Sequence, residues 1–240
     1  MSIQLIKTEP LILTITEEIA TNIDTIDVGA AYTQYLHDQV GEFEHKPLSD
    51  FVEIVSKSVN PRINQYASQI FEYINLSEVD DIYGYVLIFR IKEGRDIGST
   101  KNRFQKHDIL FAKIMPSLEN KKIALVTQDV NNAIASTEFI VLRKKPEAQI
   151  NLYYLFRALR SDFFTHQAVA NVTGATGRQR ISPTILLSLK IILPPEEIQK
   201  QIGDAVEKEF TLRTLAAEQS KKADDLAQLV LGSLTLRTES

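Results

Sequence analysis

Residues 173–202 read TGATGRQRISPTILLSLKIILPPEEIQKQI, and this stretch says most about the fold. It begins with a glycine-spaced basic loop, continues as a short apolar run that we interpret as a strand, and reaches Pro194 and Pro195. Prolines do not fit inside a helix but suit its first turn, and the two glutamates that follow favour the positive end of a helix dipole. The order therefore predicts a loop, a strand and then a helix.

A long amphipathic helix is expected over residues 194–235. Gly203 is the single helix-weakening residue before Gly232. About 35 helical residues would reach about 50 Å at 1.5 Å per residue, more than one small domain can cover. We therefore expect the apolar stripe to pair with a partner helix, the alternative being a helix packed only on its own domain. The stripe comprises Ile198, Ile202, Val206, Phe210, Leu215, Leu226 and Val230.

The chain before the basic loop predicts a small sheet followed by a helix. Residues 152–164 have helical spacing, and residues 47–55 predict a short amphipathic turn capped by Ser49 and Asp50. Without regular helices between the strands, the fold class is α+β (mixed α/β), with a small mixed or antiparallel sheet, flanking helices and a long C-terminal helix. The predicted strands, short and rich in β-branched and aromatic residues, are 71–76, 86–91, 108–115, 123–128 and 138–142.

The composition limits the class of protein. With 240 residues and 44% apolar content, we expect one main domain with an appendage. The absence of cysteine excludes disulfides and thiolate metal sites and fits a reducing compartment. The N-terminus lacks a signal-peptide pattern, and no apolar run approaches the ~20 residues of a membrane helix. A cytoplasmic location without membrane contact is expected.

The charge is unevenly distributed. The net charge of −4 argues by itself against a nucleic-acid-binding protein. Residues 1–50 hold two basic and nine acidic residues, whereas residues 84–122 hold nine and four, and residues 140–190 hold eight and two. Two basic blocks in an acidic chain suggest an electrostatic footprint for nucleic acid, the alternative being a solvated basic face.

We divide the chain into an acidic lead-in (1–45) with helical spacing at Ile19, Ile23 and Ile26, a main domain (46–193) and the long helix (194–235).

The glycine-spaced loop is the first candidate for nucleic-acid contact. Its arginines suit phosphate or guanine, its glutamine suits adenine, and its glycines let the backbone approach a ligand. The alternative is an ordinary polar turn with one arginine packed internally. The candidate residues are Thr173, Gly174, Thr176, Gly177, Arg178, Gln179 and Arg180.

A second basic segment follows the predicted strand 86–91. Its mixture of cations and amides suits sequence readout, the alternative being a solvated hairpin loop. Tyr83 and Tyr85 on either side of Gly84 are expected to pack in the core or at its rim rather than in a DNA groove. The candidates are Lys92, Arg95, Lys101, Asn102, Arg103 and Lys106, with Lys113 on the strand that follows.

Several segments, taken in order, resemble the target recognition domain of type I restriction-modification DNA specificity subunits. FEYINLSEVD (71–80) resembles its opening strand, and KHDILFAKIMP (106–116) with KKIALV (121–126) resembles its strand–turn–strand unit. ASTEFIVLR (135–143), NLYYLFRALRSDFF (151–164), TGATGRQRIS and LPPEEIQKQI follow in the family's order. The resemblance covers about residues 45–235, and the ordered set is more specific than any one segment. His107 stands where the family pattern usually has glycine.

The resemblance implies a target recognition domain over residues 46–193 and a spacer helix after it. Full-length subunits carry two such units, and each unit reads half of a split DNA site. A chain with one unit would act as a homodimer or with a second short subunit. The implied partners are double-stranded DNA and a DNA methyltransferase, with a restriction subunit as a further candidate. No base contact carries over, because the family's basic residues vary with the target sequence.

The sequence leaves two other functions open. Asp108, Glu119 and Lys121 are the residue types of a metal-dependent nuclease, although Glu119 falls in a turn and this spacing is common by chance. A protein-interaction module with the same fold would fit the net acidity. The four histidines lack metal-ligand spacing, and there is no P-loop. We therefore expect no catalytic residue, metal or cofactor, and any chemistry belongs to a partner.

Overall fold

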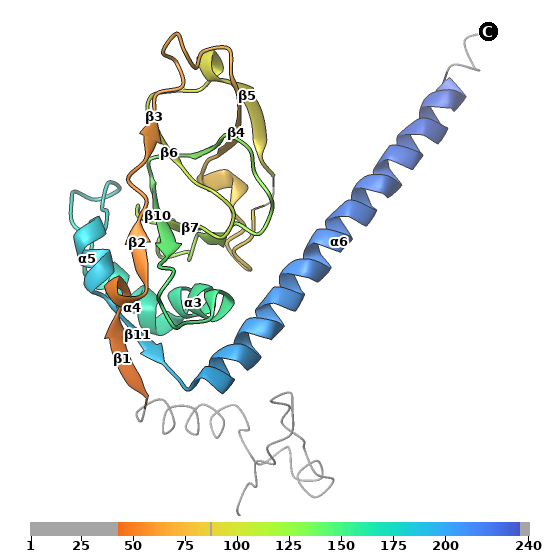
Figure 1. The fold of residues 1–240 in the computed structure, drawn as a ribbon. Coiled ribbons are helices and arrows are strands. Elements are labelled where there is room, and N and C mark those ends of the chain that lie inside the picture. The colour runs from red at the N-terminus through yellow and green to blue at the C-terminus, as the bar shows by residue number, and fades with distance from the viewer. Residues whose placement is uncertain (1–42, 87, 236–240) are drawn as a thin grey trace, which may run out of the picture.

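The structure, a computed structural model, describes residues 43–86 and 88–235 (Figure 1). These residues form a folded domain and a helix, α6 (Glu196–Thr235), that leaves the domain at one end and extends away from it. The expected long helix is therefore present. None of the described helices is both long enough and apolar enough to cross a membrane. The helical spacing around Ile19, Ile23 and Ile26 lies outside the described residues.

A four-stranded antiparallel sheet forms the middle layer of the domain. Its order is β2 (Val52–Ile54), β10 (Phe139–Lys144), β7 (Ile109–Ala112) and β8 (Ile123–Leu125). Alternate side chains of β7 enter opposite cores: Ile109 and Phe111 pack toward the helices, and Leu110 and Ala112 toward the second sheet. Burial on both faces explains why this strand reads as a continuous apolar run, since neighbouring residues face opposite sides.

The second sheet has five strands and mixed direction. Its order is β3 (Ser58–Val59), β6 (Lys101–Arg103), β9 (Ala133–Ala135), β4 (Ile70–Ile74) and β5 (Arg90–Glu93). The β4–β9 pair is parallel, and the other pairs are antiparallel. Short 3-10 segments follow β4 and β5, at η3 (Leu76–Glu78) and η4 (Gly94–Asp96). The predicted α+β fold with a mixed sheet is confirmed.

Helices cover the other face of the middle sheet. The helix expected over 152–164 is divided into α3 (Leu152–Leu159) and α4 (Asp162–Ala170). The Ser161 hydroxyl accepts a hydrogen bond from the backbone N–H of Phe164 at 3.2 Å and so starts α4. Phe156 and Phe164 are fully buried against the middle sheet and its neighbours.

The segment after the basic loop differs from the prediction of a single strand. It forms a short helix, α5 (Pro183–Ser188), and then β11 (Lys190–Leu193). The Ser182 side chain caps α5 and Pro183 occupies its first turn, a start signal that the strand interpretation overlooked. β11 pairs with β1 (Glu44–Pro47), so the two ends of the domain lie side by side.

Three further predictions are corrected. Ser49 and Asp50 lie inside the 3-10 turn η2 (Leu48–Asp50) between β1 and β2, and do not cap a longer helix. The strand expected over 86–91 begins only at Arg90, since Val86 forms just an isolated bridge with Val79. The basic segment after it is not one loop, because β6 passes between β3 and β9 in the sheet.

His107 has a backbone conformation that favours glycine. Its φ angle is 71°, in the left-handed region. This conformation gives a physical reason for glycine at the matching position of the resembling family, and histidine is among the residues that tolerate it. The turn places Asp108 at the start of β7, where its carboxylate accepts a hydrogen bond from the backbone N–H of Gln105 at 2.8 Å.

Candidate nucleic-acid interface

The glycine-spaced loop protrudes from the domain as a closed hairpin. The backbones of Thr173 and Arg180 exchange hydrogen bonds of 2.9 and 2.8 Å across its base. Gly174 and Gly177 adopt φ angles of 116° and 76°, which side chains rarely allow. All residues from Thr173 to Arg178 are exposed. The loop therefore has a defined shape and an accessible backbone, as a phosphate-contacting loop requires.

The loop is anchored to the start of β10 through Arg180. Its guanidinium donates to both carboxylate oxygens of Glu138, at 3.0 and 2.8 Å. This hydrogen bonding lowers the pKa of the Glu138 carboxyl, with partial burial acting in the opposite direction. Arg180 also donates to the backbone oxygen of Arg178 at 3.0 Å. Arg180 therefore holds the loop in place through an ion pair at the surface, with 38% of its side chain exposed.

Arg178 occupies a different environment, although only one residue separates it from Arg180. It is exposed, and its side chain makes no hydrogen bond or ion pair with any described residue. Gln179 between them is half-buried, and its backbone oxygen accepts from the N–H of Met115 at 3.0 Å. Of the loop's two cations, Arg178 is the one whose charge is available to a ligand.

The second predicted segment meets the loop at the same place. The side-chain amide of Asn102 donates to the Phe139 oxygen at 2.9 Å, beside the Glu138 that holds Arg180. Lys113 is half-buried, and its backbone N–H donates to the Glu138 oxygen at 2.9 Å. Segments far apart in sequence thus converge on residues 138–139. Glu138 was missing from the sequence-based candidates, because nothing local links it to an arginine 42 positions later.

Some of the remaining basic candidates have side chains that make contacts within the domain, and others have side chains that are accessible to solvent. Lys101 is buried and donates to the Ser99 oxygen at 2.8 Å, and burial lowers its pKa. Arg103 donates to Asn132 at 2.9 Å. These two side chains stabilise the five-stranded sheet, so they do not form the free basic loop that the sequence predicted.

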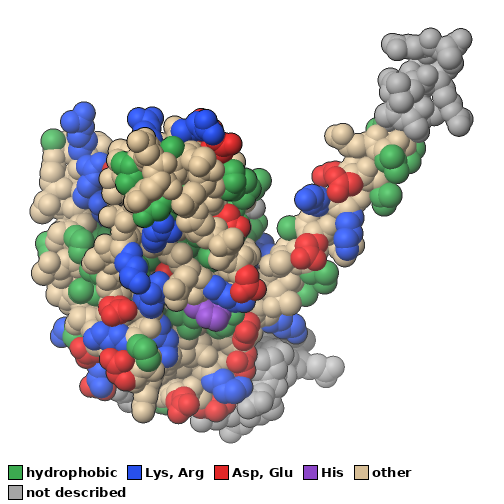
Figure 2. Space-filling model, turned by 45° about the horizontal axis from the view of Figure 1, so that its top comes forward, with side chains coloured by type: hydrophobic (Ala, Val, Ile, Leu, Met, Phe, Trp, Pro, Cys, Tyr) green, Lys and Arg blue, Asp and Glu red, His purple; other side chains and the backbone are tan. Residues whose placement is uncertain are grey.

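Three other lysines and arginines lie nearer the surface. Lys92 is half-buried on β5, and Arg95 is exposed and paired with Glu93. Lys106 pairs with Asp129 at 3.0 Å, and the Asp129 side chain is 92% exposed. Such solvent-exposed pairs are weak and exchangeable, so phosphate can compete for the cations. Figure 2 shows Lys and Arg side chains spread over the face of the domain in view, with Asp and Glu side chains among them mainly in its lower part, and both kinds of charge along the projecting helix.

Two of the three residues of the nuclease alternative, Asp108 and Lys121, make ion pairs within the domain. Asp108 is buried and receives two hydrogen bonds from the Arg143 guanidinium, at 2.7 and 2.8 Å. Lys121 pairs with Asp162 at 2.5 Å, and Glu119 is exposed in the turn after Pro116. Among residues 43–86 and 88–235, no group of three or more His, Asp or Glu side chains is arranged to hold a metal ion. The Asp108 carboxylate is therefore already neutralised by the protein itself.

The apolar stripe of α6 is divided between two roles. Val206 and Phe210 are buried, and the Phe210 ring packs edge-on against Phe156 with centroids 5.5 Å apart. This intramolecular packing removes Val206 and Phe210 from the predicted partner surface, and the half-buried Ile202 packs against the same core. Ile198 is also half-buried. Leu215, Leu226 and Val230 are exposed, as a partner surface requires.

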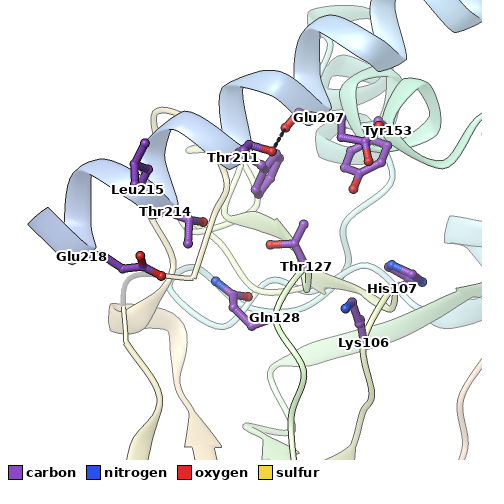
Figure 3. A pocket seen from close by; sticks show the side chains of 11 residues that line it. Lys106, His107, Thr127, Gln128, Tyr153, Glu207, Thr211, Thr214, Leu215 and Glu218 are labelled. Carbon is purple, nitrogen blue, oxygen red and sulfur yellow. Dashed lines mark hydrogen bonds between the residues drawn. The ribbon is translucent and has the colours of Figure 1, made fainter.

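Beyond Phe210 a cleft of about 530 Å³ opens between α6 and the domain (Figure 3). Thr127 and Gln128 of the domain line one side, and Thr211, Thr214 and Glu218 of α6 line the other. On this side, α6 and the domain begin to separate beyond Phe210.

The arrangement of sheets, basic loop and projecting helix can be compared with known proteins. The sequence model of the type I restriction modification DNA specificity domain matches residues 41–224. The chain belongs to this family. The resemblance read from the ordered segments is therefore confirmed, because the matched residues take in most of the domain and of α6.

Known specificity subunits show the extent of the similarity. The EcoAI specificity subunit of Escherichia coli is 27% identical over 183 residues, covering 74% of this chain and 31% of that protein. The EcoEI specificity subunit of the same species is 25% identical over 146 residues, covering 60% of this chain and 24% of that protein. This chain therefore spans about a third or less of the curated relatives it matches.

Solved structures agree on the fold. The HsdS subunit from Thermoanaerobacter tengcongensis superimposes with a TM-score of 0.57 at 27% identity, over 78% of this chain and 47% of that one. A chain from a study of complex assembly and conformational transition in the type I R-M system gives a TM-score of 0.58 at 26% identity, over 80% and 49%. This chain matches about half of each of these two structures.

Proposed function

We propose that this chain binds double-stranded DNA and reads one half of a split site, as a non-catalytic specificity subunit that docks a DNA methyltransferase. The observation that carries the proposal is the exposed glycine loop, which presents Arg178 to solvent and is held by the Arg180–Glu138 pair beneath it. A rigid loop that presents one unpaired cation and open backbone amides suits a phosphate backbone. The family membership of residues 41–224 supports the same role.

Recognition would combine the glycine-spaced loop with the second basic segment. Backbone amides at Gly174 and Gly177, the hydroxyls of Thr173 and Thr176, and the Arg178 guanidinium would position the domain on phosphates. Lys92, Arg95 and Lys106 would add neutralising charge, because the ion pairs of Arg95 and Lys106 can be exchanged for phosphates and Lys92 is only half-buried. Lys113, Asn102 and Gln179 lie nearer the anchoring point at residues 138–139 and would contribute through positioning.

Pairing through α6 would bring together the two recognition domains that a split DNA site requires. Leu215, Leu226 and Val230 expose apolar surface on a helix of 40 residues, about 60 Å long at 1.5 Å per residue. Two copies joined by this surface would place two recognition domains symmetrically and would read a palindromic split site. A second short subunit would serve the same purpose. The paired helices would also offer the methyltransferase its docking surface.

Arg178 tests the DNA-binding proposal. Binding of the wild-type chain to a random-sequence duplex pool, followed by selection, supplies a DNA probe for fluorescence anisotropy. Arg178→Ala is expected to weaken binding and to reduce the slope of log K against log salt by about 1, since one phosphate contact is lost. Lys221→Ala, which removes an exposed cation from the projecting part of α6, is the matched control and should change neither quantity.

The outcomes separate the candidate functions. Equal DNA affinity for wild type, Arg178→Ala and a variant lacking both Arg178 and Arg180 would favour a protein-interaction module. Magnesium-dependent cleavage by the purified chain that is lost in Glu119→Ala would establish a nuclease instead.

A further inference from the structure

Helix α6 contacts its domain at three successive levels. Near its start, Gly203 lies so close to Asn151 that an added Cβ would fall 2.3 Å from the Asn151 Oδ1. One to two turns later, Val206 and Phe210 enter the core. The outermost contact is Arg213, whose guanidinium carbon lies 3.2 Å from the centre of the Tyr83 ring and 5.7 Å from that of Tyr85.

Arg213 is also fixed from the side of the helices. Its guanidinium Nε donates to the Glu209 carboxylate at 3.0 Å, and the other oxygen of Glu209 accepts from Arg157 of α3 at 2.8 Å. The side chains of Tyr83, Arg213, Glu209 and Arg157 thus form one continuous chain of contacts from the 83–85 turn across α6 to α3. A planar guanidinium that is both stacked and hydrogen-bonded has its position defined in two directions.

The platform beneath Arg213 is itself rigid. Gly84 has a φ angle of 73°, and an added Cβ there would lie 2.4 Å from the Ile123 oxygen. The buried Arg160 guanidinium donates to the backbone oxygens of Asp81 and Ile82 at 2.9 and 2.8 Å. The turn that carries Tyr83 therefore has little freedom to follow a moving helix.

Beyond Arg213 the helix diverges from the domain. Every described side chain from Thr214 to Leu231 is exposed, and Figure 1 shows α6 running free of the domain. From residue 213 to residue 235 there are 22 residues, or about 33 Å of helix. We call the contact region around Arg213, where α6 leaves the domain, the joint. A tilt of about 10° at the joint would move the far end of the helix by about 6 Å, nearly two base pairs at ~3.4 Å each.

The geometry points to Arg213 as a positioning residue that fixes the angle between the recognition domain and α6, and thereby sets the spacing between two DNA half-sites. This inference rests on the proposed function, in which α6 joins two recognition domains. Val206 and Phe210 hold the base of the helix, but they lie close to the point about which α6 would tilt. Contacts so close to that point resist tilting only weakly. The Tyr83–Arg213 stack lies farther along the helix and defines the direction in which α6 leaves the domain.

The joint is tested first without DNA. Because the chain has no cysteine, Asn64→Cys on the domain and Gln228→Cys on α6 give two defined spin-label sites, both exposed. The labelled chain is diluted into an excess of unlabelled chain, so that electron–electron resonance reports the distance within one copy. A narrow distance distribution is expected for the wild-type background, and a distribution at least twice as wide for Arg213→Ala.

Additional variants separate stacking from charge and from misfolding. Tyr83→Leu attacks the same contact from the domain and should broaden the distribution, whereas Tyr83→Phe keeps the ring face and should not. Arg213→Lys keeps the charge but loses the planar group, and should not restore a narrow distribution. Lys208→Ala, an exposed cation on the same helix, is the control for loss of charge. A wild-type-like distribution in both Arg213→Ala and Tyr83→Leu would overturn the positioning role.

The spacing role is tested with duplexes selected by the wild-type chain. On duplexes that carry one half-site, Arg213→Ala should bind within twofold of wild type. On duplexes with two half-sites and graded spacers, wild type should prefer one spacer over its neighbours by about tenfold, and Arg213→Ala by less than threefold. Unchanged spacer preference in the variant would overturn the inference. Absence of DNA binding by wild type would instead contradict the proposed function, and the spacing role with it. The spin-label distances would still show whether Arg213 fixes the angle between α6 and the domain.

Discussion

Asp108 offers a sharp test, because the structure and the nuclease alternative assign it different roles. The side chain is 1% exposed, and its two oxygens accept hydrogen bonds from Arg143 at 2.7 and 2.8 Å. One oxygen also accepts from the N–H of Gln105 at 2.8 Å. The carboxylate therefore joins the turn before β7 to β10, and replacing it with alanine removes all three contacts together.

The expected loss of stability follows from burial. Removing one partner of a fully buried ion pair costs about 3–5 kcal/mol, because the other charge stays without a partner. The Arg143 side chain is 28% exposed, so water can solvate part of its charge after the substitution. We therefore expect Asp108→Ala to lower the free energy of unfolding by about 2–3 kcal/mol. For a protein of this size, that corresponds to a fall in Tm of about 5–10 °C.

Thermal and urea unfolding followed by circular dichroism measure this effect. Asp129→Ala is the matched control, since Asp129 also pairs with a cation but its side chain is 92% exposed, and we expect at most about 0.5 kcal/mol there. Arg143→Met in the Asp108→Ala background should recover part of the loss, because no unpaired charge remains. A Tm for Asp108→Ala within 1 °C of the Asp129→Ala value would refute the reasoning.

Three further predictions follow from close packing and burial. Gly203→Ala should destabilise the protein by about 1–3 kcal/mol in urea unfolding, because its Cβ meets Asn151, whereas Gly98→Ala should not, since the nearest atom lies at 3.8 Å. Gly84→Ala should cost at least about 2 kcal/mol and give an unstable protein in the same assay, from its positive φ together with the clash. Burial raises the pKa of Tyr154 from 10.0 to about 12, so its neutral form is favoured in the folded state and stability should fall by about 1.4 kcal/mol per pH unit between those values. Urea midpoints at pH 9, 10 and 11 should show this loss in wild type, with a smaller slope in Tyr154→Phe.

Local sequence patterns predicted the elements whose causes are local. The alternation around β7 and β10 and the proline-led start of α6 depend on neighbouring residues, and both elements are present. The short strand β6 was overlooked, because a strand of three residues is stabilised by its partners β3 and β9 and not by its own composition. α5 was read as a strand although Ser182 and Pro183 form a helix start.

The sequence by itself determined the α+β class, the family and the long helix, because periodicity, capping and ordered motifs are properties of contiguous residues. Only the tertiary structure decided which of two arginines in one loop is engaged, since Arg180 meets Glu138 in the turn before the distant strand β10, whereas Arg178 does not. The same holds for α6, whose stripe is periodic throughout but buried at Phe210 and exposed at Leu226. Periodicity states which side of a helix is apolar, whereas the end of the neighbouring domain decides how far that side is covered.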